Sequence, residues 1–280
     1  MQRKNVLNSP GLLELKKRRR RVFFRKIFVS FFLISVIFAS LAYISHTPGL
    51  NINAITITGN QTVSSEAIKT FIEKELEGNY IWFFPKTNIL FYPKNELKNK
   101  LSLQFQRLKD VILSIKNNET LEVKLTERVG LYTWCGNNPE ENISVDKKCY
   151  FLDKDGYIFD EAPYFSGEVY FKFYGSAKVG DFFSKKNFQQ LIYLKGALTA
   201  IKLRISSIYL LEDNDLKIFL SGSAGKAFIF IKADSDFQNM VENLQTALNT
   251  EPLLSQFKNK YSSLEYIDLR FGNKVYYKFK

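Results

Sequence analysis

The sequence contains almost no histidine and little cysteine. Its 280 residues include one histidine, His46, and two cysteines, Cys135 and Cys149. No Ser-His-Asp triad, Cys-His pair or histidine-containing metal site can therefore be built from the residues that follow His46. Two cysteines without a neighbouring histidine also supply too few soft ligands for zinc. We expect no metal site, no cofactor and no catalysis of these kinds.

Carboxylates are plentiful, yet no spacing singles out a catalytic pair. A glycosidase needs two of them about 5 to 10 Å apart across a cleft. The run Asp-Lys-Asp-Gly at residues 153–156 resembles part of a calcium loop but lacks the closing glutamate, so we expect a tight turn between two strands. We therefore expect no enzyme, and a membrane-anchored cell-wall hydrolase is the minor alternative. The candidate carboxylates are Glu127, Asp153, Asp155, Asp160, Glu161 and Asp268.

Positive charge is abundant but concentrated at the N-terminus. The chain has a formal charge of +12, and residues 1–26 carry ten basic residues against Glu14 alone, a net charge of +9. The remaining residues hold 30 basic and 27 acidic groups and are nearly neutral. Nothing aromatic is interleaved before Phe23, so we expect no nucleic-acid partner. The dense part of the tract consists of Lys16, Lys17, Arg18, Arg19, Arg20 and Arg21.

An uncharged apolar segment follows the basic tract. Residues 27–45 contain no charged side chain, and as a helix these nineteen residues are about 28 Å long, close to the ~30 Å hydrocarbon thickness of a bilayer. Basic residues beside the first apolar segment hold that end in the cytoplasm. We therefore expect a single-pass signal anchor over residues 27–46, with the bulk of the chain outside. A cleaved signal peptide is the alternative, although the apolar segment is long for one and no good A-x-A site follows it.

The two cysteines both lie in the part expected outside, where a disulfide can form. Strand-like residues 131–134 precede Cys135, and residues 150–152 follow Cys149. A long hairpin would bring the two sulfurs together, and the bridge would contribute about 3 kcal/mol in the chain-entropy model. Two unpaired thiols are the alternative.

Residues 52–126 show an alternation of strand and helix patterns. Residues 52–58 are rich in β-branched side chains, and a helix capped by Ser64 would place Ile68, Phe71, Ile72 and Leu76 on one face. After an aromatic loop over residues 80–92, Pro93 opens a second helix. Residues 108–116 and 121–126 are typical of strands joined by a turn. The predicted order is β-α-α-β-β.

Four segments carry a resemblance to a known family. Residues 55–60 (Ile-Thr-Ile-Thr-Gly-Asn) and 121–128 (Leu-Glu-Val-Lys-Leu-Thr-Glu-Arg) resemble the ends of a POTRA domain of the FtsQ/DivIB type. Residues 150–159 resemble that family's aspartate-glycine hairpin, and residues 266–271 (Tyr-Ile-Asp-Leu-Arg-Phe) its terminal strand. The resemblance implies an α+β fold: a basic tail over residues 1–26, the anchor, a POTRA domain over residues 50–128, and a mixed β-rich domain with two or more helices over residues 129–280. Within this last part the residue pattern itself predicts helices near residues 184–200 and 235–248.

The resemblance also implies a function. FtsQ/DivIB proteins are bitopic scaffolds of the bacterial cell-division complex at the septum, and they bind the FtsB/FtsL pair through a C-terminal edge strand. Carried over by motif, Arg270 and Phe271 lie in the contact strand, with Tyr266 and Tyr276 beside it. The POTRA half is implied to recruit other division proteins. The main alternative is a POTRA-containing envelope transport or assembly protein.

The last residues favour such an edge independently of the resemblance. Residues 264–271 and 274–279 flank Gly272-Asn273 and predict a hairpin. Its aromatic residues, which include Phe279, are expected to face outward along a sheet edge, where free backbone groups can accept a partner strand. For Arg270 the alternative is an ion pair with Asp268 or a neighbour, and for the aromatic residues it is ordinary core packing.

Overall fold

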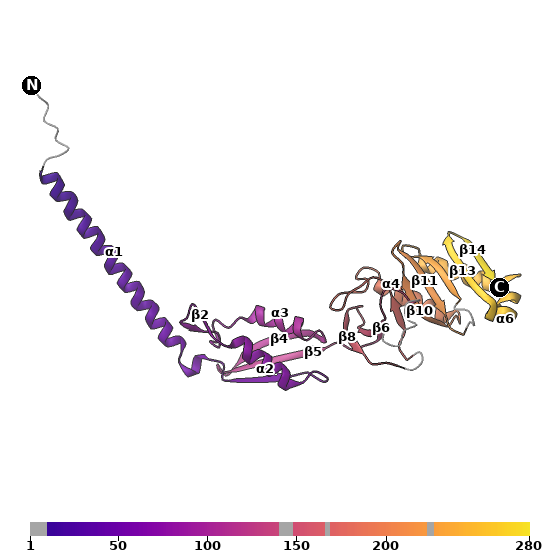
Figure 1. The fold of residues 1–280 in the computed structure, drawn as a ribbon, viewed down its shortest axis with the longest axis horizontal. Helices are drawn as coiled ribbons and strands as arrows, with labels where there is room; N and C mark the ends of the chain where they lie inside the picture. Colours follow the sequence, from indigo (N-terminus) through magenta and orange to yellow (C-terminus); the bar gives the residue numbers. More distant parts are fainter. Residues whose placement is uncertain (1–9, 140–147, 166–168, 223–226) are drawn as a thin grey trace, which may run out of the picture. The chain divides into compact units, whose positions relative to one another are not determined.

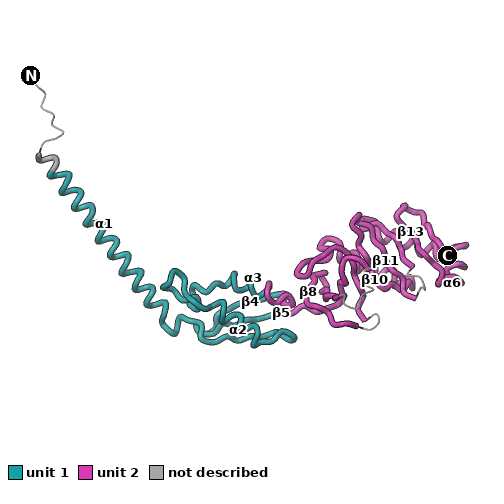
Figure 2. The backbone as a smooth tube through the Cα atoms, in the orientation of Figure 1, with its two compact units in different colours: residues 1–101, 110–126 teal, residues 102–109, 127–280 magenta. Residues whose placement is uncertain are grey.

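The computed structural model describes residues 10–139, 148–165, 169–222 and 227–280. The chain divides into two units, shown in different colours in Figure 2. Unit 1 comprises Met1–Leu101 and Asp110–Thr126, and unit 2 comprises Ser102–Lys109 and Glu127–Lys280. Unit 1 ends at Thr126, close to the expected border between residues 128 and 129. The main difference from the expected division is that residues 102–109 belong to unit 2. Mixed α+β structure with one long N-terminal helix agrees with the expected fold class (Figure 1).

Unit 1 begins with the helix α1, Pro10–Ser45. Its segment Glu14–Ser45 is long and apolar enough to span a membrane. The helix begins well before residue 27, because lysine and arginine are good helix formers and no glycine or proline interrupts the basic tract after Gly11. From Glu14 to Leu41 every side chain is exposed. An apolar helix with no buried face is typical of one surrounded by lipid.

Apart from the short β2–β3 hairpin between the two helices, the rest of unit 1 has the predicted β-α-α-β-β order. Three strands form a sheet in the order β1-β5-β4, with β1 parallel to β5. The buried side chains Ile68 and Ile72 of α2 and Leu97 and Leu101 of α3 form the core with the sheet. The elements are η2 (Pro48–Leu50), β1 (Ala54–Thr58), α2 (Ser65–Leu76), β2 (Asn79–Tyr80), β3 (Phe84–Pro85), α3 (Lys94–Gln104), β4 (Leu108–Lys116) and β5 (Thr120–Glu127).

The helix cap and the glycine turn of unit 1 form where the sequence predicts them. The Ser64 side chain accepts a hydrogen bond from the Ala67 backbone N–H and caps α2. Gly59 has a φ of +88°, and a Cβ there would lie 2.1 Å from the Leu125 carbonyl oxygen, so only glycine fits this turn. The short β2–β3 hairpin within the aromatic loop was not predicted, because two-residue strands leave no detectable periodicity.

Unit 2 is built on a nine-stranded sheet in the order β14-β13-β12-β11-β10-β9-β6-β7-β8. The helices predicted near residues 184–200 and 235–248 are α4 and α5, and α6 was not predicted. The elements are β6 (Tyr132–Trp134), β7 (Cys149–Leu152), β8 (Ile158–Ala162), β9 (Lys172–Tyr174), α4 (Phe188–Ala200), β10 (Ile205–Leu210), β11 (Asp215–Leu220), β12 (Phe228–Lys232), α5 (Phe237–Leu248), α6 (Leu253–Lys260), η4 (Tyr261–Ser263), β13 (Leu264–Phe271) and β14 (Lys274–Phe279).

One face of this sheet packs on α4 and α5. Leu194 of α4 and Leu244 of α5 are fully buried in one cluster with Ile218, Ile229 and Ile267 of the central strands. Each such side chain contributes about 1.5 to 3 kcal/mol on burial. Because successive side chains of a strand alternate between faces, the neighbours of these isoleucines lie on the opposite face.

The predicted turn at residues 153–156 joins β7 to β8. Asp153 Oδ1 accepts hydrogen bonds from the backbone N–H groups of Asp155 and Tyr157, which is an Asx-type turn. Asp153 also forms an ion pair with Arg128, whose guanidinium carbon lies 3.8 Å from the centre of the Tyr157 ring. Arg128 Nε has no hydrogen-bond partner among the described residues, and this ring contact accounts for its burial.

Lysines flank the same turn. Lys109 and Lys154 both bond Asp155, and hydrogen bonds from Lys109 first and Lys154 second lower its pKa to about 2. Arg107 Nε lies 2.6 Å from Asp160 Oδ2 in the middle of β8. These ion pairs attach residues 107–109 to the β7–β8 hairpin, within unit 2.

Cys135 and Cys149 form a disulfide, with their Cα atoms 4.2 Å apart. The hairpin expected around them consists of β6 and β7, which pair antiparallel with Trp134 opposite Tyr150. Extending that register by one residue places Cys135 opposite Cys149, so strand pairing alone brings the sulfurs together. Residues 140–147 of the connection lie outside the described residues.

Removing the bridge should destabilise unit 2. The double variant Cys135→Ser/Cys149→Ser is expected to lose about 3 kcal/mol of unfolding free energy, because the bridge closes a short loop in the unfolded chain. Urea denaturation of protein purified from the envelope measures this loss. Reduction should change the mobility and stability of the wild type and leave the double variant unaffected. Free thiols in the purified wild type would contradict the bridge.

Candidate partner-binding edge

The last strand of the chain, β14, forms one end of the nine-stranded sheet (Figure 1). It pairs antiparallel with β13, and no other strand pairs with it in the part of the chain that the structure describes. The outward backbone groups of an edge strand are free to accept a further strand. Lys274 and Lys278 on this strand are exposed, and lysine on an edge discourages indiscriminate pairing.

The side chains of β14 alternate between the two faces of the sheet. Val275, Tyr277 and Phe279 are partly buried against the helix-side core. Tyr276 lies on the opposite face, in register with Asp268. The expectation that Phe279 faces outward was therefore wrong, because it has the same parity along the strand as Val275 and Tyr277.

Arg270 is held by two carboxylates on the face opposite the helices. Its Nε and Nη2 lie 3.0 and 2.7 Å from the oxygens of Asp268, and its Nη1 lies 2.7 Å from Asp215 Oδ2. The guanidinium carbon also lies 4.4 Å from the centre of the Phe230 ring on the strand between them. The ion pair with Asp268, the alternative to partner contact, is thus present, and Arg270 connects β13 to β11 across β12.

The charges of this cluster depend on one another. Burial of Asp268 opposes its ionisation, but hydrogen bonds from Arg270 and the positive charge of that residue outweigh burial and lower the pKa of Asp268. The hydrogen bonds that Arg270 donates, to Asp268 first and to Asp215 second, raise the pKa of Arg270. The cluster is therefore a set of paired charges that joins β13 to β11 on the face of the sheet opposite the helices. No sequence signal links Asp215 to Arg270, since the two residues are 55 positions apart.

Two exposed rings lie beside Arg270. Phe271 is 57% exposed and Tyr276 is 48% exposed, and their ring centres are 5.4 Å apart in an edge-to-face arrangement. Tyr266 is half-buried and stacks on Phe228 of β12 with ring centres 6.1 Å apart. Lys217 adds a positive charge 4.2 Å from the centre of the Phe228 ring. Aromatic residues and arginine are enriched at the centres of protein interfaces, whereas lysine and aspartate are depleted there.

The position of the predicted residues differs in one respect from the expectation. Arg270, Phe271 and Tyr266 lie on β13, which pairs with β12 on one side and β14 on the other. Tyr276 alone lies on the edge strand itself. A partner strand would therefore pair with β14, and Phe271 would contact it only through its side chain.

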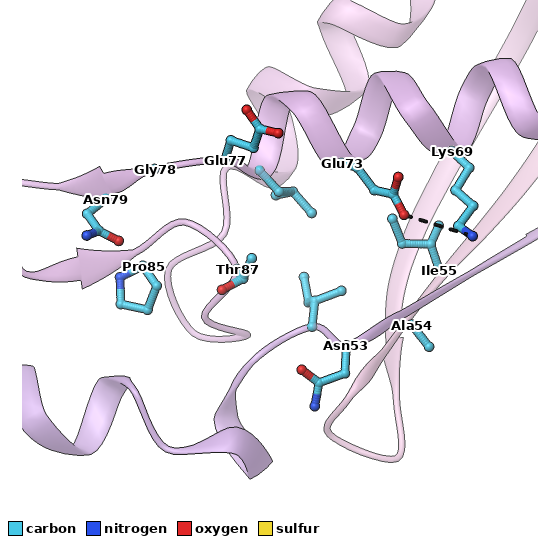
Figure 3. A pocket seen from close by; sticks show the side chains of 12 residues that line it. Asn53, Ala54, Ile55, Lys69, Glu73, Glu77, Gly78, Asn79, Pro85 and Thr87 are labelled. Atoms are coloured by element: carbon cyan, nitrogen blue, oxygen red, sulfur yellow. Dashed lines mark ion pairs between the residues drawn. The ribbon is translucent and has the colours of Figure 1, made fainter.

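A separate groove of about 600 Å³ lies in unit 1 between β1, the end of α2 and the β2–β3 hairpin. Figure 3 shows Lys69 and Glu73 on its wall, joined by an ion pair of 3.9 Å. No histidine or cysteine lines it. Thr87, also in the lining, donates a hydrogen bond of 2.9 Å to Asn51 Oδ1.

Neither the comparison with protein-family models nor that with curated proteins finds a match for this chain. Among the described residues, no group of three or more histidine, cysteine, aspartate or glutamate side chains could hold a metal ion.

The variant Asp268→Asn tests the charged support. At neutral pH it should lower the unfolding free energy by about 1.5 to 3 kcal/mol, the range for hydrogen bonds to a charged group. Because the folded pKa of Asp268 is lowered, the carboxylate stabilises the fold fully above its unfolded pKa of about 3.9 and loses this effect as the pH falls through the folded pKa.

The difference between wild type and variant should thus shrink below about pH 4, the region of the unfolded pKa, in urea denaturation followed at several pH values. Asp234→Asn, at an exposed carboxylate, is the control and should change little. A difference that stays constant down to low pH would rule out the charge of Asp268 as its cause.

Proposed function

We propose that this chain is a single-pass scaffold of the bacterial cell-division complex, of the FtsQ/DivIB type. It would lie in the inner membrane at the septum with its N-terminus in the cytoplasm and would link early and late division proteins without catalysing a reaction. Its C-terminal edge would bind an FtsB/FtsL-like pair. The α1 segment that is long and apolar enough to span a membrane supports the anchoring.

The observation that carries the proposal is the edge of β14, with which only β13 pairs among the described residues. A partner segment that adds as a further strand gains main-chain hydrogen bonds along β14, while side chains give specificity. One face of such a strand would meet Tyr276 between Lys274 and Lys278, so acidic or aromatic partner residues suit it. The other face would continue the apolar row of Val275, Tyr277 and Phe279.

The order of helices and strands in unit 1 also supports the proposal. Its β-α-α-β-β order agrees with the POTRA domain that the resemblance implies for residues 50–128. In that family this domain recruits other division proteins. The same order favours the alternative, an envelope transport or assembly protein, because POTRA domains occur in both classes.

Substituting the two exposed rings tests the edge. Phe271→Ala/Tyr276→Ala should weaken co-purification of an FtsB/FtsL-like pair by more than about 10-fold, because buried aromatic residues dominate interface energies at about 2 kcal/mol or more each. Both rings are about half-exposed in the free chain, so the fold should persist. Thermal unfolding of the variant checks this.

The matched control is Tyr193→Ala, which removes a ring of similar exposure from α4 and should leave co-purification unchanged. Full recovery of the pair with the double variant would contradict the edge as the binding site. A pair recovered by neither wild type nor variants, with outer-membrane assembly proteins recovered instead, would favour the transport alternative.

A further inference from the structure

An aromatic loop packs against the apolar helix α1 within unit 1. This aromatic loop is residues 80–92, which include β3 and the turn before it. Phe38 of α1 makes edge-to-face contacts with Phe83 and Phe84, with ring centres 5.7 and 5.3 Å apart. The fully buried Asn88 donates a hydrogen bond of 3.0 Å to the Ser45 carbonyl at the end of α1. The loop is thus attached to the helix at two levels.

The outer surface of the aromatic loop is strongly apolar. Trp82 is 91% exposed and Leu90 is 72% exposed, and the other exposed apolar side chains are Ile81, Phe83 and Phe91. Such a concentration of large apolar groups is uncommon on a surface that faces water. Ile81 and Trp82 have φ values of +48° and +69°, a rare conformation for a β-branched residue. The turn therefore holds both side chains away from the core despite an unfavourable backbone.

The loop carries no negative charge. Between Glu77 and Glu96 the only charged residues are Lys86 and Lys94. Tryptophan and tyrosine concentrate where a bilayer meets water, and lysine there extends its charge to the headgroups. A loop rich in apolar residues, with Lys86 in it, Lys94 just after it and no acidic residue, thus suits the surface of a phospholipid bilayer.

The depth of Phe38 within the bilayer indicates what surrounds the aromatic loop. Phe38 precedes Ser45, the last residue of α1, by seven residues, which is about 10 Å along the helix axis. The uncharged segment of residues 27–45 is about as long as the hydrocarbon layer is thick, so Phe38 lies inside that layer when α1 spans it. Rings in contact with Phe38 share its depth to within the contact distance.

We propose that the aromatic loop is a second membrane contact, which inserts Ile81, Trp82, Leu90 and Phe91 into the outer leaflet beside α1. A phospholipid surface is the occupant that fits, because the apolar surface of the loop is continuous with the exposed apolar side chains of α1. The insertion holds unit 1 against the bilayer at two places and restricts its rotation about the end of the helix. This contact does not depend on the division partners.

Tryptophan fluorescence can test the insertion, because Trp82 and Trp134 are the only two tryptophans in the sequence. The full chain is placed at one copy per disc in nanodiscs of phosphatidylethanolamine and phosphatidylglycerol, with or without acyl chains brominated near the headgroup. Trp82 emission, obtained as wild type minus Trp82→Phe, should be blue-shifted and quenched by the brominated lipid. Trp134 is buried in unit 2 and bonded to the Gly175 carbonyl, so its emission in Trp82→Phe should not be quenched.

A pair of variants tests the role of the neighbouring side chains. Ile81→Ser/Leu90→Ser should reduce lipid quenching of Trp82, because the loop then inserts less deeply. Leu103→Ser removes an equally exposed apolar side chain at the end of α3 and should leave the quenching unchanged. All three positions are exposed, so folding should be preserved.

Emission of Trp82 at the wavelength of water-exposed tryptophan, quenched by aqueous acrylamide and insensitive to brominated lipid, would overturn the insertion. Shielding of Trp82 that appears only with two copies per disc would also overturn it, in favour of self-association.

Discussion

The parallel pairing of β12 with β13 is the constraint on which the candidate site depends. Parallel neighbours cannot be joined by a tight turn, so the chain needs a crossover. Helices α5 and α6 supply it, and residues of α5 fill the core on one face of the sheet. The crossover returns the chain beside β12 as β13. The final hairpin then places β14 on the other side of β13, where it becomes the edge strand. The same arrangement puts Phe228, Phe230 and Arg270 on the face opposite that core.

The ion pairs on that face preorganise the end of the sheet for a partner. Arg270 bonds carboxylates on two strands and lies over a ring on the strand between them. A strand held in this way loses little conformational freedom when a partner binds, which is the advantage of a preorganised surface. In unit 1 the contact of Phe38 with the aromatic loop performs a comparable task, because it holds exposed apolar side chains at a definite level of α1. Both surfaces combine rings with basic groups, but the loop lacks carboxylates.

Local patterns predicted much of the secondary structure. The limits of β4, β13 and β14 were predicted to the residue, and the Ser64 cap and the turn at Asp153 were expected from their own side chains. These features depend on residues within a few positions of one another. The β2–β3 hairpin and α6 were missed, since each is too short or too polar to carry a clear period. The inner position of β13 was missed for a different reason: strand order is set by pairing between segments far apart in the chain.

By itself the sequence determined the apolar segment that can span a membrane, the alternation of each strand and the hairpin that brings Cys135 to Cys149, because spacing along the chain decides all three. Only the tertiary structure decided that β14 rather than β13 is the edge, that Phe279 faces the core and that Asp215 is a second partner of Arg270. It also brought the aromatic loop to Phe38. Alternation says which side chains share a face, but neighbours across a sheet, and the helix against which a loop packs, depend on contacts that no local pattern encodes.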